Sequence, residues 1–266
     1  MRESGSLVCV GLDPDPGRMP VRDAGEFGRR IVDTTRDLVC AYKMQLAYYE
    51  ALGLEGLRAL EVTVRHVREA APGVVIVGDA KRGDIGSTAR AYASAMFDVW
   101  GFDVVTVQAY LGRDSLEPFV ERGDRGALVV CRTSNPGARD VQDLRVDGVP
   151  VYRWVAALAE ECNGLGNVGL VVGATYPSEL EELRGAYPEM PFLVPGVGAQ
   201  GGDAGAAARL GAGVRGGRCM IASSRGIIYA SADGGSYARA AREAVMRMRG
   251  EISAGLAGGR GGGEAG

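Results

Sequence analysis

Short apolar runs alternate with longer amphipathic stretches along almost the whole chain, and this alternation restricts the fold more than any other feature. Several runs are apolar on consecutive residues, as in Val74-Val75-Ile76-Val77, which is typical of parallel strands buried on both faces. We expect strands at residues 7–12, 41–44, 74–80, 104–107, 127–131, 168–172, 192–194 and 219–222. Helical patterns follow them at residues 26–39, 48–70, 87–100, 114–122, 151–163, 178–186, 203–210 and 237–249.

Eight strand–helix alternations in 266 residues predict an α/β protein with a (βα)8 barrel, the TIM barrel. A doubly wound open sheet is the alternative, because periodicity alone does not separate the two architectures. No linker-like stretch interrupts the series, so we expect a single catalytic barrel domain over residues 1–252. Residues 253–266 are rich in Gly and Ala and are expected to form a disordered tail.

The charge and the cysteine and histidine content argue against several classes of function. A net charge of −3 disfavours a general nucleic-acid or membrane-surface binder. No run reaches the roughly 18 apolar residues of a membrane span, and the N-terminus lacks a signal-peptide pattern, so we expect a cytoplasmic protein. Five scattered cysteines without a C-x-x-C pair, and a single histidine, argue against a disulfide framework, a metal site and Ser-His-Asp chemistry.

Lysine is nearly absent from this chain, since Lys43 and Lys81 are the only two lysines among 30 Lys and Arg residues. Unlike Arg, Lys can donate or lose a proton near neutral pH. Lys81 lies between Asp79 and Asp84, and Asp79 and Lys81 are two apart on a predicted strand, so their side chains leave the same face. An ammonium held by carboxylates at a strand end suits proton chemistry.

Other polar residues also come just after predicted strands, where a barrel places its catalytic face. Asp13 follows the first strand, and Lys43 lies in the second. Ser87 is a candidate N-cap for the helix that follows the third predicted strand. The fifth predicted strand is followed by Arg132-Thr133-Ser134-Asn135-Pro136-Gly137-Ala138. Its hydroxyl and amide groups suit either the edge of a polar heterocycle or a turn, and the chemistry alone leaves both open.

Two glycine-containing loops follow the last two predicted strands. The first is Pro195-Gly196-Val197-Gly198-Ala199-Gln200-Gly201-Gly202-Asp203, and the second is Ser223-Ser224-Arg225-Gly226. Loops at these positions form phosphate sites in many barrels, because glycine lets backbone N–H groups approach an anion. The pair therefore predicts a phosphate-binding site.

Taken together, these motifs resemble those of the orotidine 5′-phosphate decarboxylase family in its longer bacterial form. The most specific match is Asp79-x-Lys81-x-x-Asp84-Ile85. The other matches are Gly11-Leu12-Asp13-Pro14, Tyr42-Lys43, the segments 132–138 and 195–203, and Ser224-Arg225-Gly226-Ile227. They occur in the family's order and span about residues 7 to 230.

The resemblance implies decarboxylation of orotidine 5′-monophosphate (OMP) to uridine 5′-monophosphate (UMP) in pyrimidine biosynthesis, without a cofactor or metal. Lys81 would stabilise and protonate a carbanion at C6, within a charge network of Lys43, Asp79, Lys81 and Asp84. Asp84, Ile85 and Thr88 would reach the site of a neighbouring subunit, which implies a homodimer.

The resemblance also implies how the substrate is held. Asp13 and Lys43 would bind the ribose hydroxyls, and Ser134 would bind the pyrimidine, with the role of the adjacent Thr133 left open. Gln200 and Arg225 would hold the phosphate. The remaining substrate-binding residues are Pro195, Gly198, Gly201 and Ser224.

Three other functions remain as alternatives. A Mg²⁺-dependent sugar-phosphate decarboxylase or aldolase could use the same charged strand motif. Lys43 or Lys81 could form a Schiff base with a carbonyl substrate. A protein without catalytic activity could bind UMP, although a pure binder has no evident reason to place two acids beside an ammonium.

Overall fold

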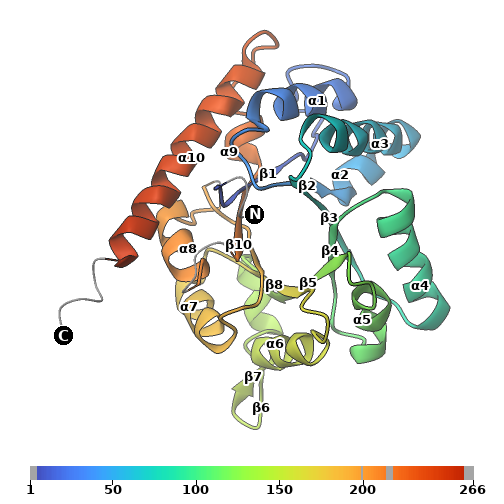
Figure 1. The fold of residues 1–266 in the computed structure, drawn as a ribbon, viewed down its shortest axis with the longest axis vertical. Helices are drawn as coiled ribbons and strands as arrows, with labels where there is room; N and C mark the ends of the chain where they lie inside the picture. The colour runs from blue at the N-terminus through green and yellow to red at the C-terminus, as the bar shows by residue number, and fades with distance from the viewer. Residues whose placement is uncertain (1–4, 199, 214–217, 261–266) are drawn as a thin grey trace.

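The strands close into a barrel. The computed structural model describes residues 5–198, 200–213 and 218–260. Parallel strands follow one another in the order β1-β10-β9-β8-β5-β4-β3-β2, and β1 pairs with both β10 and β2 (Figure 1). The strands are β1 (Val8–Gly11), β2 (Ala41–Gln45), β3 (Val75–Arg82), β4 (Val104–Val107), β5 (Gly126–Arg132), β8 (Val168–Val172), β9 (Phe192–Val194) and β10 (Cys219–Ser223). The predicted (βα)8 barrel and its eight strands are thus confirmed, and the open sheet is excluded.

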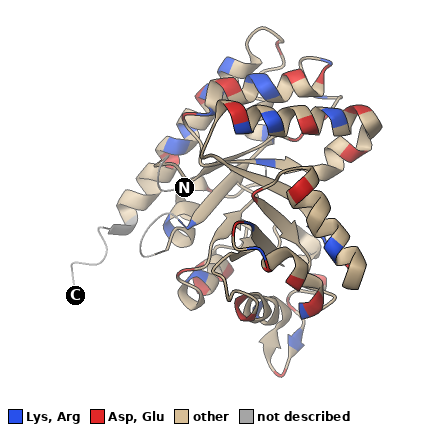
Figure 2. Ribbon diagram, turned by 45° about the vertical axis from the view of Figure 1, so that its right-hand side comes forward, with Lys and Arg blue, Asp and Glu red and all other residues tan. Residues whose placement is uncertain are grey.

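Helices surround the barrel and carry most of the charged residues, while the strands are largely uncharged (Figure 2). They are α1 (Ala24–Thr35), α2 (Leu46–Ala51), α3 (Gly53–Ala70), α4 (Gly86–Ser94), α5 (Arg113–Val120), α6 (Val151–Glu161), α7 (Pro177–Ala186), α8 (Ala204–Gly211), α9 (Arg225–Ile228) and α10 (Tyr237–Arg260), with a π-helical turn at Ala95–Val99. Within the described ranges, no helix is long and apolar enough to cross a bilayer.

One expected helix is divided in two, and one expected helix cap is absent. The helix expected over residues 48–70 is two helices, because Gly53 adopts a left-handed conformation (φ +63°) that interrupts the first one. Ser87 is not a cap, since α4 already begins at Gly86, and Ile85 occupies the N-cap position without a side-chain hydrogen bond. Asp203, by contrast, caps α8 by accepting a hydrogen bond from the Ala206 amide at 2.6 Å.

Apolar side chains pack in two layers, one between the strands and the helices and one inside the barrel. The inner cluster includes Cys9, Val77, Leu128, Val171 and Leu193. Strands packed on both faces explain the consecutive apolar residues of the sequence. Cysteines in these strands are buried and free, which confirms a packing role for them.

A hairpin that the sequence did not predict lies between β5 and α6. It begins with a 3₁₀ turn at Pro136–Asp140 and continues as the paired strands β6 (Arg145–Val146) and β7 (Val149–Pro150), which extend beyond α6 in Figure 1. Residues 133–150 are called the β5–α6 strap below. Its base is held by Arg132, which is only 1% exposed and forms ion pairs with Asp143 (3.0 Å) and Glu179 of α7 (3.4 Å).

The C-terminal helix is longer than expected. Helix α10 continues to Arg260, so residues 253–260 are helical where the sequence suggested a disordered tail. A Cβ atom added at Gly255 would lie 2.2 Å from the carbonyl oxygen of Gly205 in α8, so glycine here permits a close helix crossing. Ile252 is buried in the same contact region. The rest of the expected tail, residues 261–266, lies outside the described residues.

Candidate active site

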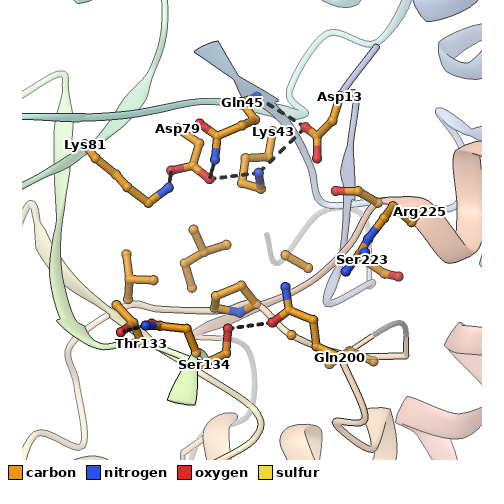
Figure 3. Close-up of a pocket in the computed structure, with 18 of the residues that line it drawn as sticks. Asp13, Lys43, Gln45, Asp79, Lys81, Thr133, Ser134, Gln200, Ser223 and Arg225 are labelled. Atoms are coloured by element: carbon orange, nitrogen blue, oxygen red, sulfur yellow. Dashed lines mark hydrogen bonds and ion pairs between the residues drawn. The ribbon is translucent and has the colours of Figure 1, made fainter. Parts of the chain in front are cut away.

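A polar cavity of about 520 Å³ opens at the carboxyl ends of the strands. In Figure 3 the charged residues of β1 to β3 lie on one side, Thr133, Ser134 and Gln200 lie opposite, and Arg225 lies between the two groups at one end. The predicted site residues that line the cavity are Asp13, Lys43, Asp79, Lys81, Thr133, Ser134, Pro195, Gln200, Ser224 and Arg225. Apolar side chains of Val130, Val171, Leu193 and Ala222 also line it.

A network of charges around Asp79 forms one wall of the cavity. One carboxylate oxygen of Asp79 accepts a hydrogen bond from Lys43 Nζ (2.9 Å), and the other accepts one from Lys81 Nζ (2.5 Å). Lys43 also lies 3.9 Å from Asp13. The Lys43 side chain is 6% exposed whereas that of Lys81 is 41% exposed. Lys43 is therefore the more buried ammonium at the cavity wall, and Lys81 is the more exposed of the two (Figure 3).

The surroundings of Asp79 and Lys43 favour the ionised form of both groups. Burial alone would raise the pKa of the Asp79 carboxyl, but Lys43 and Lys81 more than offset burial and hold that pKa well below its ordinary value. Burial alone would lower the pKa of Lys43, but Asp13 and Asp79 raise it above its ordinary value. Asp79 and Lys43 are consequently both charged at neutral pH.

The backbone of Lys81 adopts an unusual conformation, with a φ of 47° that non-glycine residues seldom take. It lies where the register between β3 and β4 shifts, between Gly78 and Arg82. Buried Thr106 of β4 stabilises this point, because its hydroxyl accepts a hydrogen bond from the Lys81 amide and donates one to Asp79, both at 2.9 Å. The bulge thereby places the Lys81 ammonium beside Asp79.

Sequence reasoning missed two residues that complete the network. Gln45 donates a hydrogen bond to Asp79 at 3.0 Å, and Thr106 binds the other carboxylate oxygen. The position of Gln45, two residues after Lys43 on one strand, is a usable signal, because such residues share a face. Thr106 gives little signal, since a lone threonine in an apolar strand is common.

The glycine-rich loop after β9 closes on itself. Its glycines Gly196, Gly198 and Gly201 have positive φ values of 96°, 74° and 90°. The amides of Gly198 and Gly201 donate hydrogen bonds to carbonyl groups of the same loop, at 2.9 and 2.8 Å. These two predicted residues do not line the cavity, and their amides are already bonded, so they contribute no free anion-binding donor in this structure.

Arg225 lines the cavity, and among the described residues it has no ion-pair partner. The strand that precedes it is packed tightly against β1. A Cβ atom added at Gly11 would lie 1.8 Å from the hydroxyl oxygen of Ser224, so only glycine fits there. The described end of the cavity thus offers Arg225, Ser223, Ser224 and Gln200 as side chains for an anion.

Three further predicted residues, Asp84, Ile85 and Thr88, also do not line this cavity. Asp84 accepts a hydrogen bond from the neighbouring Ile85 amide at 2.8 Å, and Ile85 is 57% exposed. They follow β3 and begin α4. The structure therefore brings together three members of the expected Lys-Asp-Lys-Asp network and leaves Asp84 apart.

No cluster of three or more His, Cys, Asp or Glu side chains suited to a metal ion occurs in the part of the chain that the structure describes. The single histidine, His66, contacts Asp33 at 2.7 Å on the outer helices α3 and α1. It belongs to the helical shell and does not line the cavity.

Residues 6–241 match the family model described as "Orotidine 5′-phosphate decarboxylase / HUMPS family". The chain belongs to this family. It is 48% identical to the orotidine 5′-phosphate decarboxylase of Azoarcus sp. (strain BH72), with 95% of each chain covered. Identity to the orotidine 5′-phosphate decarboxylase of Roseiflexus sp. (strain RS-1) is also 48%, over 96% of this chain and 95% of the relative.

Solved structures of orotidine 5′-phosphate decarboxylases share the fold. The OMP decarboxylase of Leishmania donovani superposes with a TM-score of 0.84 at 38% identity, covering 96% of both chains. The UMP synthase of the same organism gives a TM-score of 0.85 at 40% identity, over 95% of this chain but 54% of the longer protein. The resemblance inferred from the motifs is confirmed at the level of the family.

Proposed function

We propose that this protein decarboxylates OMP to UMP and CO2 in pyrimidine biosynthesis, using its own side chains alone. The observation that supports this most is the pair of ammonium groups on one buried carboxylate, with Lys81 reaching the cavity at one end and Arg225 placed at another. The names of the relatives at about 48% identity agree with it. Detection of UMP as the product of OMP in a purified sample, by chromatography, tests the proposal.

The chemical difficulty of this reaction is the charge left on the ring. When the bond between C6 and the carboxylate breaks, its electron pair stays on C6 in the plane of the ring, where the pyrimidine carbonyl groups cannot take it up. A preorganised cation in a water-poor site stabilises such a charge effectively. Lys81 is placed for this task, and its ammonium then donates a proton to C6 to complete UMP.

The other members of the network hold the Lys81 ammonium in place. Asp79 binds Lys81 and Lys43 through different oxygens, so the carboxylate cannot turn without losing one of them. Gln45 and Thr106 hold the same two oxygens. Asp13 and Lys43 would bind ribose hydroxyls and Ser134 would bind the base, and all three residues line the cavity.

The phosphate end gives a direct test of substrate orientation. We expect Arg225→Ala to lower kcat/KM by about 100-fold, mainly through a higher KM, because a charge-assisted contact to phosphate is lost. Steady-state kinetics with OMP measure this. Arg209→Ala removes an exposed arginine of α8 far from the cavity and is the matched control. An unchanged kcat/KM in the Arg225 variant would remove Arg225 from the phosphate site.

The residues outside the cavity lead to a second part of the proposal, a homodimer with shared sites. Asp84, Ile85 and Thr88 would complete the site of the neighbouring subunit. The exposure of Ile85 on the surface of a single chain supports this arrangement.

Mixing two inactive variants tests the shared sites. Lys81→Ala and Asp84→Ala should each be inactive alone, but a hybrid dimer contains one site with an intact Lys81 and an intact Asp84. We expect activity to return when the two proteins are unfolded and refolded together. Failure to regain activity, with hybrid dimers present by mass spectrometry, would contradict sharing.

The proposal also covers the organisation of the chain. A single catalytic domain, cytoplasmic location and independence from metals and organic cofactors are all part of it, with the domain boundary moved from residue 252 to the described end of α10 at Arg260. The tight crossing of α8 and α10 supports counting α10 with the catalytic barrel.

A further inference from the structure

Within the β5–α6 strap, Gln142 folds back onto Thr133 at the edge of the cavity. Gln142 of the strap makes two hydrogen bonds to Thr133: the Thr133 amide donates to Gln142 Oε1 at 2.9 Å, and Gln142 Nε2 donates to the Thr133 hydroxyl at 2.8 Å. The hydroxyl of Thr133 in turn donates to Asn135 Oδ1 at 2.7 Å. Thr133 and Asn135 both line the cavity.

These bonds between Gln142, Thr133 and Asn135 are called the relay below, and the contact of Gln142 with the Thr133 amide fixes the orientation of the Gln142 side chain. A backbone N–H can only donate, so the atom of Gln142 that it meets must be the carbonyl oxygen. The other end of the amide, Nε2, must then donate to the Thr133 hydroxyl. That hydroxyl has one proton, which it gives to Asn135, and so the oxygen of the Asn135 amide is used as an acceptor.

The relay determines which hydrogen-bond donors and acceptors of Thr133 and Asn135 are available to a ligand. The proton of the Thr133 hydroxyl is already used, so Thr133 cannot donate to a ligand without breaking the relay. The Asn135 side chain is exposed, and its NH2 group is turned away from the oxygen that Thr133 occupies. Ser134 donates to Gln200 at 2.6 Å and keeps its lone pairs. Asn135 is therefore left with a side-chain amide donor that the relay does not use.

Gln142 is itself firmly placed. Its backbone amide donates to Ala138 at 2.8 Å, and its carbonyl accepts from Tyr152 at 3.1 Å. The next residue, Asp143, forms the ion pair with buried Arg132. These bonds on both sides of Gln142 fix the side chain that sets the relay.

We infer that Gln142 is a positioning residue that fixes the hydrogen-bond polarity of Thr133 and Asn135, so that the Asn135 amide donates to a carbonyl oxygen of the base. This inference rests on the proposed function, in which the base is a pyrimidine. It assigns base recognition beside Ser134 to Asn135, and gives Thr133 the role of transmitting the orientation set by Gln142.

Two ligands separate base recognition from general binding. UMP carries the base, whereas ribose 5-phosphate keeps the sugar and the phosphate but has no base. In Gln142→Glu, a carboxylate of similar shape accepts from the Thr133 amide but cannot donate, so the Thr133 hydroxyl turns to it and releases Asn135. We expect the Kd for UMP to rise roughly tenfold, with an unchanged Kd for ribose 5-phosphate, in calorimetric titrations.

Further variants show whether Gln142 acts through Asn135. Asn135→Ala, at an exposed position, should cause the same selective loss, and the double variant should bind UMP no more weakly than Asn135→Ala alone. Arg145→Ala is the matched control, because it removes an exposed strap side chain that, among the described residues, bonds only to Gly148 and takes no part in the relay. It should leave the ratio of the two Kd values unchanged.

The outcomes separate the possible failures. Equal weakening of UMP and ribose 5-phosphate by Gln142→Glu would reduce Gln142 to a structural support and overturn the inference. Unchanged UMP binding in both Gln142→Glu and Asn135→Ala would also overturn it, while leaving the proposed function intact. If the wild-type protein bound ribose 5-phosphate but gained nothing from the base of UMP, both the inference and the proposed function would fall.

Discussion

Replacement of Lys81 by alanine is expected to reduce turnover of OMP by at least about 10⁴-fold, because it removes both the charge beside C6 and the proton donor. The fold should survive, since the Lys81 side chain is 41% exposed and ends at the cavity rather than in the core. Single-turnover kinetics together with a thermal melt measure the two quantities separately. Near-normal turnover in this variant would refute the assignment of Lys81.

Lys81→Arg separates the two tasks of this residue. Arg keeps a positive charge near Asp79 but does not release a proton near neutral pH. We expect it to remain far below the wild-type rate while binding UMP. Recovery of most of the activity in Lys81→Arg would show that charge alone is sufficient and that the proton comes from elsewhere.

Replacement of Asp79 by alanine is expected to damage both activity and stability. Lys43 is 5% exposed and would keep only the more distant Asp13, at 3.9 Å, as an acidic partner. Removing one partner of a buried pair leaves an uncompensated charge and costs about 3–5 kcal/mol of unfolding free energy. Lys81 would also lose its anchor, so turnover should fall steeply. Denaturant unfolding and OMP kinetics measure the two losses.

A second variant separates the two effects of Asp79→Ala. Lys43→Met combined with Asp79→Ala removes the stranded buried ammonium and should regain much of the stability, but no activity. Asp37→Asn, at an exposed carboxylate bound by Arg242, is the control for loss of a surface pair and should change stability far less. A double variant no more stable than Asp79→Ala would show that burial of Lys43 is not the source of the loss.

The strands were predictable because of a simple physical cause. Runs such as Val168–Val172 are buried on both faces, so every residue in them is apolar. A short run of this kind, followed by a helical pattern, indicates a buried parallel strand. The helices were predictable in place but not in detail. Gly53 interrupts one helix through its backbone conformation, which a helical pattern does not reveal.

For the end of the C-terminal helix, the sequence predicted disorder where the structure has a helix. Glycine and alanine around Gly255 suggest disorder when only composition is considered. In the structure that glycine permits contact with Gly205 of α8, a partner fifty positions earlier in the sequence. Long-range contacts of this kind have no local signature.

The charged side of the cavity was predictable from local spacing, and the loops that face it were predictable from their place after strands, but the contacts that support these loops were not. Lys43, Asp79 and Lys81 follow from their place at strand ends, and Gln45 could have been added by the same rule. Gln142 could not, because it reaches Thr133 from an irregular strap whose path depends on the ion pair of Arg132 with Asp143. In the proposed homodimer the role of Asp84 depends on a second chain, which one sequence does not position.

The most direct test of the central claim is the ultraviolet absorbance of OMP mixed with purified protein that has been treated with EDTA. We predict rapid loss of the orotate band, because the proposed mechanism relies on Lys81 and carboxylates and needs no metal. An unchanged spectrum from a folded, dimeric protein would contradict this account. If activity then appeared with a sugar phosphate and Mg²⁺, the barrel would serve the metal-dependent chemistry instead.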